Sequence, residues 1–527
     1  MATDIGEHPR IGPDGGGRVA LVVDGNDVEA PDDVTLLEAL REHLAETGPK
    51  DGCSPQGQCG CCTVLVDGAP RVACVTPVRR VRGRAITTAG GLDDAEVWAQ
   101  AFSDTGASQC GFCTPGIICR LAGLRDKKPD AGHAEVEQAL LAHVCRCTGW
   151  RTILDAWDAY GTPAPDRDMD AAVERATLEG GVPQAVGPQV ALGDGGFADD
   201  TAPRDSLVAV LDPGGAWTLA ESVAAARAAA GKVQGRRTTA EATPPLEVPD
   251  GDWDVVLQTS WVDPAYLETD ASWSDGSAGA DPLANGGAFG GKTASPLPAE
   301  AQRLATEREE LVRAVWSRED AVRLGPKRPP LAAGLRSDGS GIVRVARTDG
   351  VADAIRSVLP RVEIEEVDLL GPPTSTDLRG SGWAEAVVLA AACAGAVGIV
   401  SQSDGGSATA AVDDDGAIRV TVDAGEPLDE VVLRSYCVGA AHQALSWVTS
   451  ESIFVDDDGT VHDLTVRSFG IVRAVDTPPI DVTIDPGAGP AVAVSDAVFA
   501  AVAAAVWLHQ GTPPSWPTGR PLRTPTP

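Results

Sequence analysis

The stretch CSPQGQCGCCTVLVDGAPRVAC, residues 53–74, holds five of the twelve cysteines of this 527-residue chain. Its first half is a glycine-rich loop, and its second half reads as two short strands joined by Asp67 and Gly68, a pair typical of tight hairpin turns. A glycine-rich loop lets backbone N–H groups come close to buried, negatively charged sulfur atoms, which need such donors. The stretch therefore predicts a site built on cysteine sulfur, with a hairpin that returns Cys74 to the loop.

The residues before this stretch favour a small mixed domain. Residues 19–23, VALVV, predict a strand, and Asp24 and Gly25 predict the turn that follows it. Residues 35–44, TLLEALREHL, place four leucines on one face of a helix. We therefore expect a sheet with a helix packed on it, into which the cysteine loop is inserted.

A second group of cysteines follows the first. Ten of the twelve cysteines lie between positions 53 and 147, and this group consists of CGFC at 110–113, Cys119 and CRC at 145–147. Pro115 suits the first turn of a helix over PGIICRLAGL, and EVEQALLAHV has helical periodicity and ends at CRC. We expect two turns at helix ends to face each other and to supply two thiols each.

Two kinds of metal centre compete for these thiols. Four thiolates around a compact site suit either zinc or an iron–sulfur cluster. Cys59 and Cys62 are spaced as in plant-type ferredoxins, although five residues rather than four separate Cys53 from Cys59. The pair Cys145 and Cys147 fits zinc poorly, because two to four residues usually separate paired zinc cysteines and only one separates these two. The spacing of the second group therefore favours iron–sulfur chemistry.

Together these motifs resemble those of a known family. The cysteine loop, QCGFCTPG at residues 109–116 and CRCTGW at residues 145–150 resemble the iron–sulfur half of the xanthine dehydrogenase/aldehyde oxidase family, whose members are molybdenum hydroxylases. The resemblance covers residues 18–165. It implies an α+β multidomain protein with a β-grasp [2Fe–2S] ferredoxin domain, a four-helix [2Fe–2S] domain and an α+β molybdopterin-subunit-like domain.

The resemblance also divides the chain. Residues 1–17 would be a flexible N-terminus, residues 18–88 the plant-type ferredoxin-like domain and residues 89–165 the helical cluster domain. Residues 166–195 are rich in Pro, Gly, Asp and Ala and predict a linker. Residues 196–527 would form a shortened molybdopterin-binding-subunit-like region, about half as long as the family usually has.

By position in the family motifs, eight cysteines are implied as cluster ligands. Those of the first cluster would be Cys53, Cys59, Cys62 and Cys74, and those of the second would be Cys110, Cys113, Cys145 and Cys147. Cys61 occupies a slot where the family has a small residue, so it is expected not to be a ligand. Cys119 lies on a predicted helix and is expected to pack. Gln109 matches the glutamine that touches the pterin in the family.

The C-terminal region resembles the family's molybdenum subunit in pieces and departs from it at important points. GGAFGGK resembles the glycine loop that lies against the cofactor, which makes Gly286, Gly287, Phe289 and Gly290 candidate cofactor-binding residues. The family's catalytic glutamate lies in a G-x-G-E turn, whose best match here is GAGP at 487–490. Proline has no ionisable group and cannot act as a general base.

Other carboxylates do not fill this gap by sequence alone. The family's glutamine before the Gly-Phe loop has no counterpart, and neither has its Gly-Gln-Gly turn. Glu268 and Glu451 lie near family-like segments, but they read more simply as solvated or structural carboxylates. No stretch is long enough for a flavin domain, so we expect no FAD in this chain. The catalytic residues stay unknown.

Composition and charge limit the kinds of partner and the cellular location that we expect for this chain. The formal net charge is -34, which disfavours nucleic acid and anionic membrane surfaces as partners. The N-terminus has no apolar targeting segment, and the longest apolar run, 386–400, is too short to span a bilayer and predicts a buried helix. We therefore expect a cytoplasmic protein without a membrane span.

The sequence leaves three functions open. The first is an iron–sulfur electron-transfer component that passes electrons from a molybdopterin site through two [2Fe–2S] clusters, with separate molybdopterin-binding and FAD-binding subunits as partners. The second is a self-contained hydroxylase, similar to aldehyde oxidoreductase, that binds its own molybdenum–molybdopterin. The third is a non-catalytic assembly scaffold that carries the clusters. Metal and pterin content of the purified chain distinguishes them.

Overall fold

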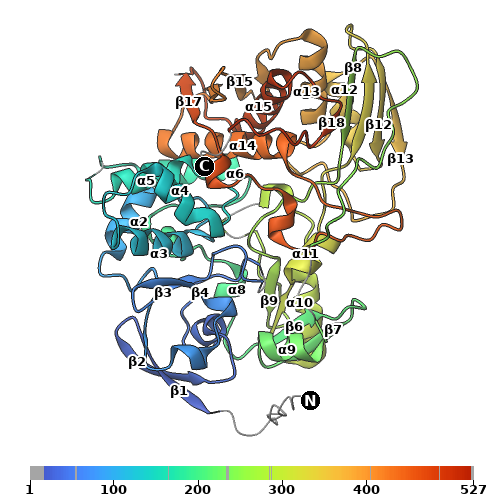
Figure 1. Cartoon of the computed structure of the whole chain (residues 1–527). Helices are drawn as coiled ribbons and strands as arrows, with labels where there is room; N and C mark the ends of the chain where they lie inside the picture. The colour runs from blue at the N-terminus through green and yellow to red at the C-terminus, as the bar shows by residue number, and fades with distance from the viewer. Residues whose placement is uncertain are drawn as a thin grey trace, which may run out of the picture.

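The structure is a computed structural model that describes residues 17–53, 56–163, 165–232, 237–283, 285, 288–403, 405–485 and 487–523. Within these residues the strands form four sheets, flanked by helices (Figure 1). The first sheet comes from the N-terminal fifth of the chain, and the other three come from residues after 206. The four-helix unit lies between the first sheet and the part of the C-terminal region that holds β15 and β17 (Figure 1). The expected multidomain α+β class is confirmed.

The first sheet is the expected ferredoxin-like unit. Its strands have the order β2-β1-β5-β3-β4, with β1 and β5 parallel and the other pairs antiparallel. They are β1 Arg18–Val23, β2 Asn26–Pro31, β3 Thr63–Val66, β4 Ala69–Val72 and β5 Ala85–Thr87. The predicted helix over 35–44 is split into α1 (Leu36–Glu38) and a π-helical turn, η1 (Ala39–His43). Thr35 caps it by accepting a bond from the Glu38 N–H.

The helical unit follows the predicted periodicity closely. Its helices are α2 Ala95–Asp104, α3 Thr114–Arg125, α4 His133–Ala139 and α5 Arg151–Ala159. Pro115 lies in the first turn of α3, where a missing N–H does no harm. The Trp98 ring packs against Trp157 and Tyr160, and the Arg125 guanidinium lies over the Trp157 ring. This aromatic cluster fixes α2 against α5.

The segment at 166–195, which the sequence predicts as a linker, contains two helices. These are α6 (Met169–Gly180) and α7 (Pro188–Ala191). Arg175 on α6 is fully buried and donates to the carbonyl oxygens of Glu426 and Pro427. The connection between the two halves of the chain is therefore anchored on the C-terminal half.

The C-terminal region has two parts. The smaller part is the sheet β7-β6-β10-β9 with α9 and α10. Its elements are α8 Ala198–Thr201, β6 Leu207–Leu211, β7 Trp217–Ala220, α9 Val223–Ala229, β9 Ala271–Ser274, α10 Leu297–Arg308, β10 Val312–Val315 and α11 Arg318–Leu324. In β6 and β10, which pair in parallel, most side chains are buried, as expected for central strands.

The larger part joins two sheets through buried helices. The sheets have the orders β13-β12-β11-β8-β18 and β14-β15-β16-β17. The elements are β8 Val255–Thr259, β11 Leu331–Leu335, β12 Gly341–Ala346, α12 Val351–Val358, β13 Val362–Val367, α13 Trp383–Ala394, β14 Val400–Ser401, β15 Ser407–Val412, β16 Ile418–Asp423, α14 Glu430–Thr449, β17 Ile480–Asp485, α15 Ser495–His509 and β18 Ser515–Trp516.

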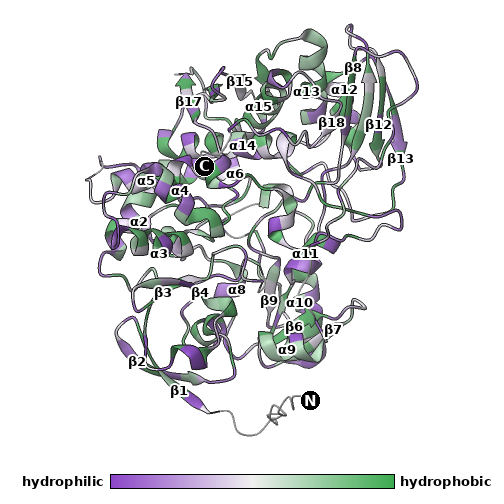
Figure 2. Ribbon diagram, viewed as in Figure 1, coloured by the Kyte–Doolittle hydropathy of each residue, from purple (hydrophilic) through white to green (hydrophobic). Residues whose placement is uncertain are grey.

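The alanine-rich helices form the core of this larger part. Helices α13 and α15 are hydrophobic along most of their length (Figure 2), and α14 and α15 share one core cluster. The apolar run at 386–400 is helical only as far as Ala394, because Gly395 adopts a left-handed conformation with φ of 69° and ends α13. Among the described residues, no helix is both long and apolar enough to cross a membrane.

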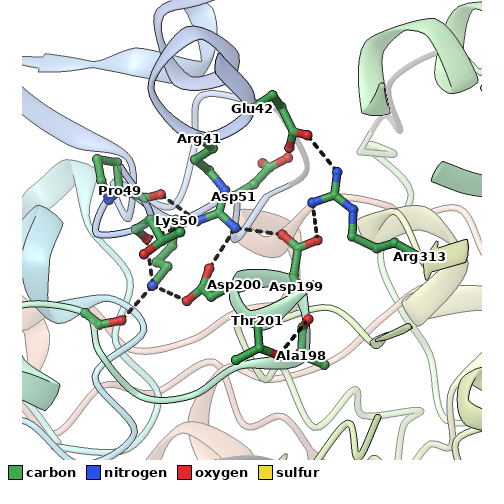
Figure 3. A network of polar contacts seen from close by, with 12 residues as sticks. Arg41, Glu42, Pro49, Lys50, Asp51, Ala198, Asp199, Asp200, Thr201 and Arg313 are labelled. Carbon is green, nitrogen blue, oxygen red and sulfur yellow. Dashed lines mark hydrogen bonds and ion pairs between the residues drawn. The ribbon is translucent and has the colours of Figure 1, made fainter. Parts of the chain in front are cut away.

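A buried charge network fastens the ferredoxin-like unit to the smaller C-terminal part. The Arg41 guanidinium donates to Asp199 at 2.8 Å and to Asp200 at 2.7 Å, and the Lys50 ammonium also pairs with Asp200 (Figure 3). Arg313 on β10 reaches back to Glu42 at 2.7 Å. Because each buried charge has an opposite partner, separating the two units would leave several charges buried and uncompensated.

Candidate functional site

The first cysteine group is closed by the hairpin, as the sequence predicts. The four thiols Cys53, Cys59, Cys62 and Cys74 are buried, with at most 3% of any of them exposed. The Cys53 thiol lies within hydrogen-bonding reach of Cys59 and Cys74, and Cys74 lies within reach of Cys62. The contacts with Cys59 and Cys74 hold the pKa of Cys53 well below its ordinary value, because they stabilise its thiolate.

Backbone donors surround these sulfurs. The Gln56 N–H points at the Cys53 sulfur at 3.1 Å, and the Gln58 N–H does so at 3.5 Å. The Cys74 N–H lies 3.5 Å from the Cys62 sulfur. Such N–H groups stabilise the negative charge on cluster ligands. The glycine-rich loop therefore has the backbone geometry that the sequence analysis expects of it.

The second cysteine group joins two helix-end turns. Cys110 and Cys113 precede α3, and Cys145 and Cys147 precede α5. Across the gap, Cys110 is within reach of Cys147, and Cys113 is within reach of Cys145. The Thr148 hydroxyl lies 3.0 Å from the Cys145 sulfur. Two pairs of thiols from two turns thus face each other.

This arrangement suits a binuclear cluster. A [2Fe–2S] cluster takes four thiolates, which are shared between its two irons. Each cysteine group offers four thiols to such a cluster, and all of them are buried except Cys110, which is partly exposed. The ligand assignment of the individual cysteines stays a prediction.

Cys61 lies between the two groups. Its thiol is fully buried and within reach of the Cys59 thiol; its field raises the pKa of Cys113 in the second group, and the field of Cys145 raises the pKa of Cys61 itself. The loop passes close to the first turn of α3, since a Cβ atom on Gly116 would lie 2.3 Å from the Gly60 carbonyl oxygen. The two cysteine groups are therefore in direct contact through this loop.

A cavity of about 430 Å³ adjoins the second cysteine group. Three predicted cofactor-binding residues, Gln109, Phe289 and Gly290, line it together with Cys110 and Cys147. The structure thus brings together side chains that lie up to 181 positions apart in the sequence. The other two candidates, the glycines at 286 and 287, lie outside the described residues.

Helix α14 closes the cavity against the second cysteine group. The Gln109 amide donates to the Cys147 carbonyl oxygen at 2.7 Å and to the Ser435 hydroxyl on α14 at 2.9 Å. Only glycine fits at position 439, because a Cβ atom there would lie 1.8 Å from the Cys147 carbonyl oxygen. Helix α14 therefore packs directly on the backbone of a predicted cluster ligand.

Each cation that lines the cavity is already paired. Arg146 is bound to Glu451, Lys292 to Glu268 at 2.5 Å, and Arg379 to Asp496 at 3.6 Å. The lining also includes the carboxylates of Glu179 and Asp377. The size of the cavity fits a pterin-sized ligand. Its charge does not fit the phosphate of such a cofactor, since the described lining residues include no unpaired cation.

Glu268 is a cavity residue that the sequence analysis rated as solvated or structural. Its carboxylate lines the cavity, and one of its oxygens has no hydrogen-bond partner among the described residues. Burial raises its pKa to about 7, against the opposing effect of Lys292. No sequence signal separates such a carboxylate from an ordinary one. Glu451, by contrast, is fully paired with Arg146 and is structural, as expected.

The turn GAGP leads into the cavity wall. Residues Ala493, Ser495 and Asp496, which follow it at the start of α15, line the cavity. The N-terminus of α15 is capped by Glu179 of α6, whose carboxylate accepts from the backbone N–H groups of Val494 and Ser495. Sequence reasoning missed Glu179 because it lies in the predicted linker, 316 residues before Ser495.

Comparison with known proteins agrees with this geometry. Residues 21–79 match the 2Fe-2S iron-sulfur cluster binding domain family, and residues 87–158 match the [2Fe-2S] binding domain family. The nicotinate dehydrogenase small FeS subunit of Eubacterium barkeri is 40% identical over 118 residues, which cover 22% of this chain and 74% of that protein. Aldehyde oxidoreductase of Megalodesulfovibrio gigas is 42% identical over 127 residues, which cover 23% of this chain and 14% of that enzyme.

The fold of the whole chain has a counterpart among solved structures. The aldehyde oxidoreductase from Desulfovibrio desulfuricans aligns with a TM-score of 0.65 at 14% identity, covering 93% of this chain and 97% of that one. Two [2Fe–2S]-binding domains on such a fold define an iron–sulfur oxidoreductase. The chain belongs to the xanthine dehydrogenase/aldehyde oxidoreductase family.

Proposed function

We propose that this chain is the iron–sulfur electron-transfer component of a molybdenum-hydroxylase-type enzyme. It would pass electrons from a molybdopterin site through two [2Fe–2S] clusters. The first cluster would be held by Cys53, Cys59, Cys62 and Cys74, and the second by Cys110, Cys113, Cys145 and Cys147. The observation that carries the proposal is the order of the parts. The second cysteine group lines the cavity on one side and lies next to Cys61 of the first loop on the other.

The residues around the thiols suit this role. Each cluster, when bound, supplies a one-electron carrier held by four thiolates. The N–H groups of Gln56 and Gln58 stabilise negative charge on the Cys53 sulfur, and the Thr148 hydroxyl does so on the Cys145 sulfur. Burial keeps water away from the sulfurs of the first group and of Cys113 and Cys145, whereas Cys110 and Cys147 border the cavity.

The electrons can come from a molybdopterin site in a partner subunit or from one in this chain. The relative in Eubacterium barkeri is named as a small FeS subunit, which supports a complex with separate molybdopterin-binding and FAD-binding subunits. The proline in GAGP and the paired cations of the cavity support the same reading. A second candidate, a hydroxylase with its own molybdopterin, is favoured by one observation, the pterin-sized cavity beside the second cysteine group.

Metal analysis of the purified full chain tests the proposal. We expect about four irons per chain and two distinct [2Fe–2S] signals in electron paramagnetic resonance, with neither molybdenum nor pterin. One molybdenum and one pterin per chain would instead establish the self-contained hydroxylase. A spectrum without two distinct cluster signals would contradict both candidates. Production in a host that makes molybdopterin is necessary, so that an empty cavity reflects the chain and not the supply.

A scaffold function differs from electron transfer in one measurement. A scaffold needs the clusters only for its fold, so their reduction need not be coupled to any partner. If the proposed function is correct, both clusters accept electrons from dithionite and return them to an added acceptor within one mixing experiment. Clusters that are present but cannot be reoxidised by any acceptor would favour the scaffold.

A further inference from the structure

The segment after the first cysteine group has an unusual charge for this chain. The protein has 42 basic and 76 acidic residues, yet residues 68–92 contain five arginines and no Asp or Glu. Arg84 is paired with Asp67 at 2.7 Å. The other four are exposed, and in the described part of the chain none of them forms an ion pair. We call residues 71–82, which hold these four arginines, the arginine segment; they are Arg71, Arg79, Arg80 and Arg82.

The arginine segment contains the last cysteine of the first group. Cys74 is 3% exposed, whereas Val75 beside it is 54% exposed and is one of the few large apolar side chains on the surface. Arg79 lies five positions after Cys74, so their Cα atoms are at most about 18 Å apart. Four exposed arginines and one exposed apolar side chain therefore lie within eight positions of Cys74 along the chain.

The backbone holds these side chains in a fixed arrangement. Two short 3₁₀ turns, η2 (Ala73–Val75) and η3 (Val78–Val81), carry most of the segment. The Val78 N–H donates to the Val34 carbonyl oxygen at 3.1 Å, and the Leu36 N–H donates to the Thr76 carbonyl oxygen at 2.7 Å. Asp33, which precedes Val34 in the chain, forms no ion pair with the segment among the described residues. Within the described part of the chain, the positive charge is therefore presented to solvent and is not neutralised by an ion pair.

We infer that the arginine segment is the docking surface for a small acidic electron-carrier protein, which accepts one electron from the first cluster. The inference rests on the proposed function and adds the kind of partner and the residues that bind it. In the transfer the reduced cluster loses one electron and the carrier gains one. The step itself neither forms nor breaks a covalent bond.

Charge selects this partner. The chain as a whole, at -34, repels extended anionic surfaces such as membranes and nucleic acids. A small acidic protein can touch the arginine segment alone, within the roughly 10 Å over which exposed charges act at ordinary salt. Opposite charges at such a rim mainly raise the association rate. Val75 supplies the apolar contact that a transient interface needs at its centre.

The test follows reoxidation of the dithionite-reduced full chain by stopped flow. The two probes are an acidic flavodoxin and a basic cytochrome c. We expect flavodoxin to react about tenfold faster at low salt than at high salt. The variant Arg79→Glu/Arg80→Glu should lose about tenfold in the flavodoxin rate at low salt and gain in the cytochrome c rate.

A matched control carries the same change of net charge elsewhere. Arg204 and Arg308 are also exposed and without ion pairs among the described residues, and Arg204→Glu/Arg308→Glu should leave both rates within about twofold. Equal effects of the two double variants would overturn the inference, as would a wild type without charge preference. Salt-sensitive binding of the segment to anionic lipid vesicles, with no effect on flavodoxin, would overturn it in favour of a membrane surface.

The same experiment separates the inference from the proposed function. If the wild type does not show two distinct cluster signals, the proposed function fails, and the inference fails with it. If both clusters are present and reducible but the arginine variants behave like the control, only the inference fails. The cluster signals of each variant, recorded before mixing, show that the substitutions have not removed the first cluster.

Discussion

The N-terminal and C-terminal halves of the chain resemble the family in different ways, the first in sequence and the second in fold. Residues 21–158 match two cluster-binding families, whereas the whole chain resembles aldehyde oxidoreductase in fold at only 14% identity. A cluster needs sulfur at fixed points, so its cysteines leave a signature that can be read from sequence. A cavity needs only packed walls, so it persists here while the turn GAGP, next to its wall, has no carboxylate. The chemistry of the first half can therefore be read from its sequence motifs, whereas the second half resembles the family mainly in its fold.

The strongest way to test this comparison is to remove one thiol from the second group. Cys147→Ser should abolish the second cluster and leave the first intact, because a serine oxygen is a poor substitute for a thiolate on iron. Electron paramagnetic resonance of the reduced chain should then show one [2Fe–2S] signal in place of two. Iron content should fall by about half.

The control for this variant is a cysteine far from both groups. Cys393 lies on α13 and is partly exposed, so Cys393→Ser should keep both signals. Loss of both signals in Cys147→Ser would mean that the two clusters assemble as one unit. In that case the ferredoxin-like and helical units would not be independent, despite their separate family matches.

The sequence predicted the first half far better than the second. The hairpin and helix α3 could be predicted because turn residues and the position of Pro115 act locally. The ligand roles of the eight cysteines stay a prediction. The family resemblance implied that Gln109 and Phe289 lie near one cofactor, but the walls of the cavity could not be predicted, since they meet only through tertiary packing. The same holds for Glu179, whose role as a cap of α15 depends on a contact over more than 300 positions. The place of Glu268 in the cavity wall likewise depends on tertiary packing, and its burial, not its neighbours in sequence, raises its pKa.

A second test asks whether the C-terminal half supports the second cluster. Arg146 lies between Cys145 and Cys147, and it forms a bidentate ion pair with Glu451, which is 1% exposed. Glu451→Ala would leave the guanidinium buried without its partner, which costs about 3–5 kcal/mol. We expect a lower midpoint of thermal unfolding and partial loss of the second cluster signal, with the first signal unchanged.

The control replaces both members of this pair. Arg146→Met/Glu451→Leu removes both charges and leaves apolar groups of similar size, which should recover most of the lost stability. If Glu451→Ala unfolds at the wild-type midpoint, the pair is not what holds the second cysteine turn on the C-terminal half. The packing of α14 on the Cys147 carbonyl would then be the remaining support.

The pKa of Glu268 gives a smaller effect that probes the cavity itself. Burial raises this pKa from 4.5 to about 7, so the folded chain binds more protons here than the unfolded chain between these values. The contribution of this group to stability should therefore fall as pH rises through that window. The wild-type minus Glu268→Gln infrared difference should show a protonated carboxyl at about pH 6 and a carboxylate at about pH 8. A carboxylate at both pH values would mean that the effect of Lys292 on the pKa of Glu268 outweighs the effect of burial. Glu268 would then stay negatively charged in the cavity.

The smallest expected effect concerns Cys61, the one thiol of the opening stretch without an assigned ligand role. Contact with Cys59 lowers its pKa, but burial and the fields of Cys53, Cys62 and Cys145 together outweigh this contact and raise the pKa overall. A protonated Cys61 thiol could therefore donate to the Cys59 sulfur once Cys59 binds iron as a thiolate. A donor to a ligand sulfur stabilises the reduced cluster. Cys61→Ala should keep both clusters and lower the potential of the first by about 20–40 mV, the equivalent of one weak hydrogen bond. Cys61→Ser, which keeps a donor, should shift it less. Loss of the first cluster in either variant would make Cys61 a ligand, and the irregular spacing between Cys53 and Cys59 would then be the reason.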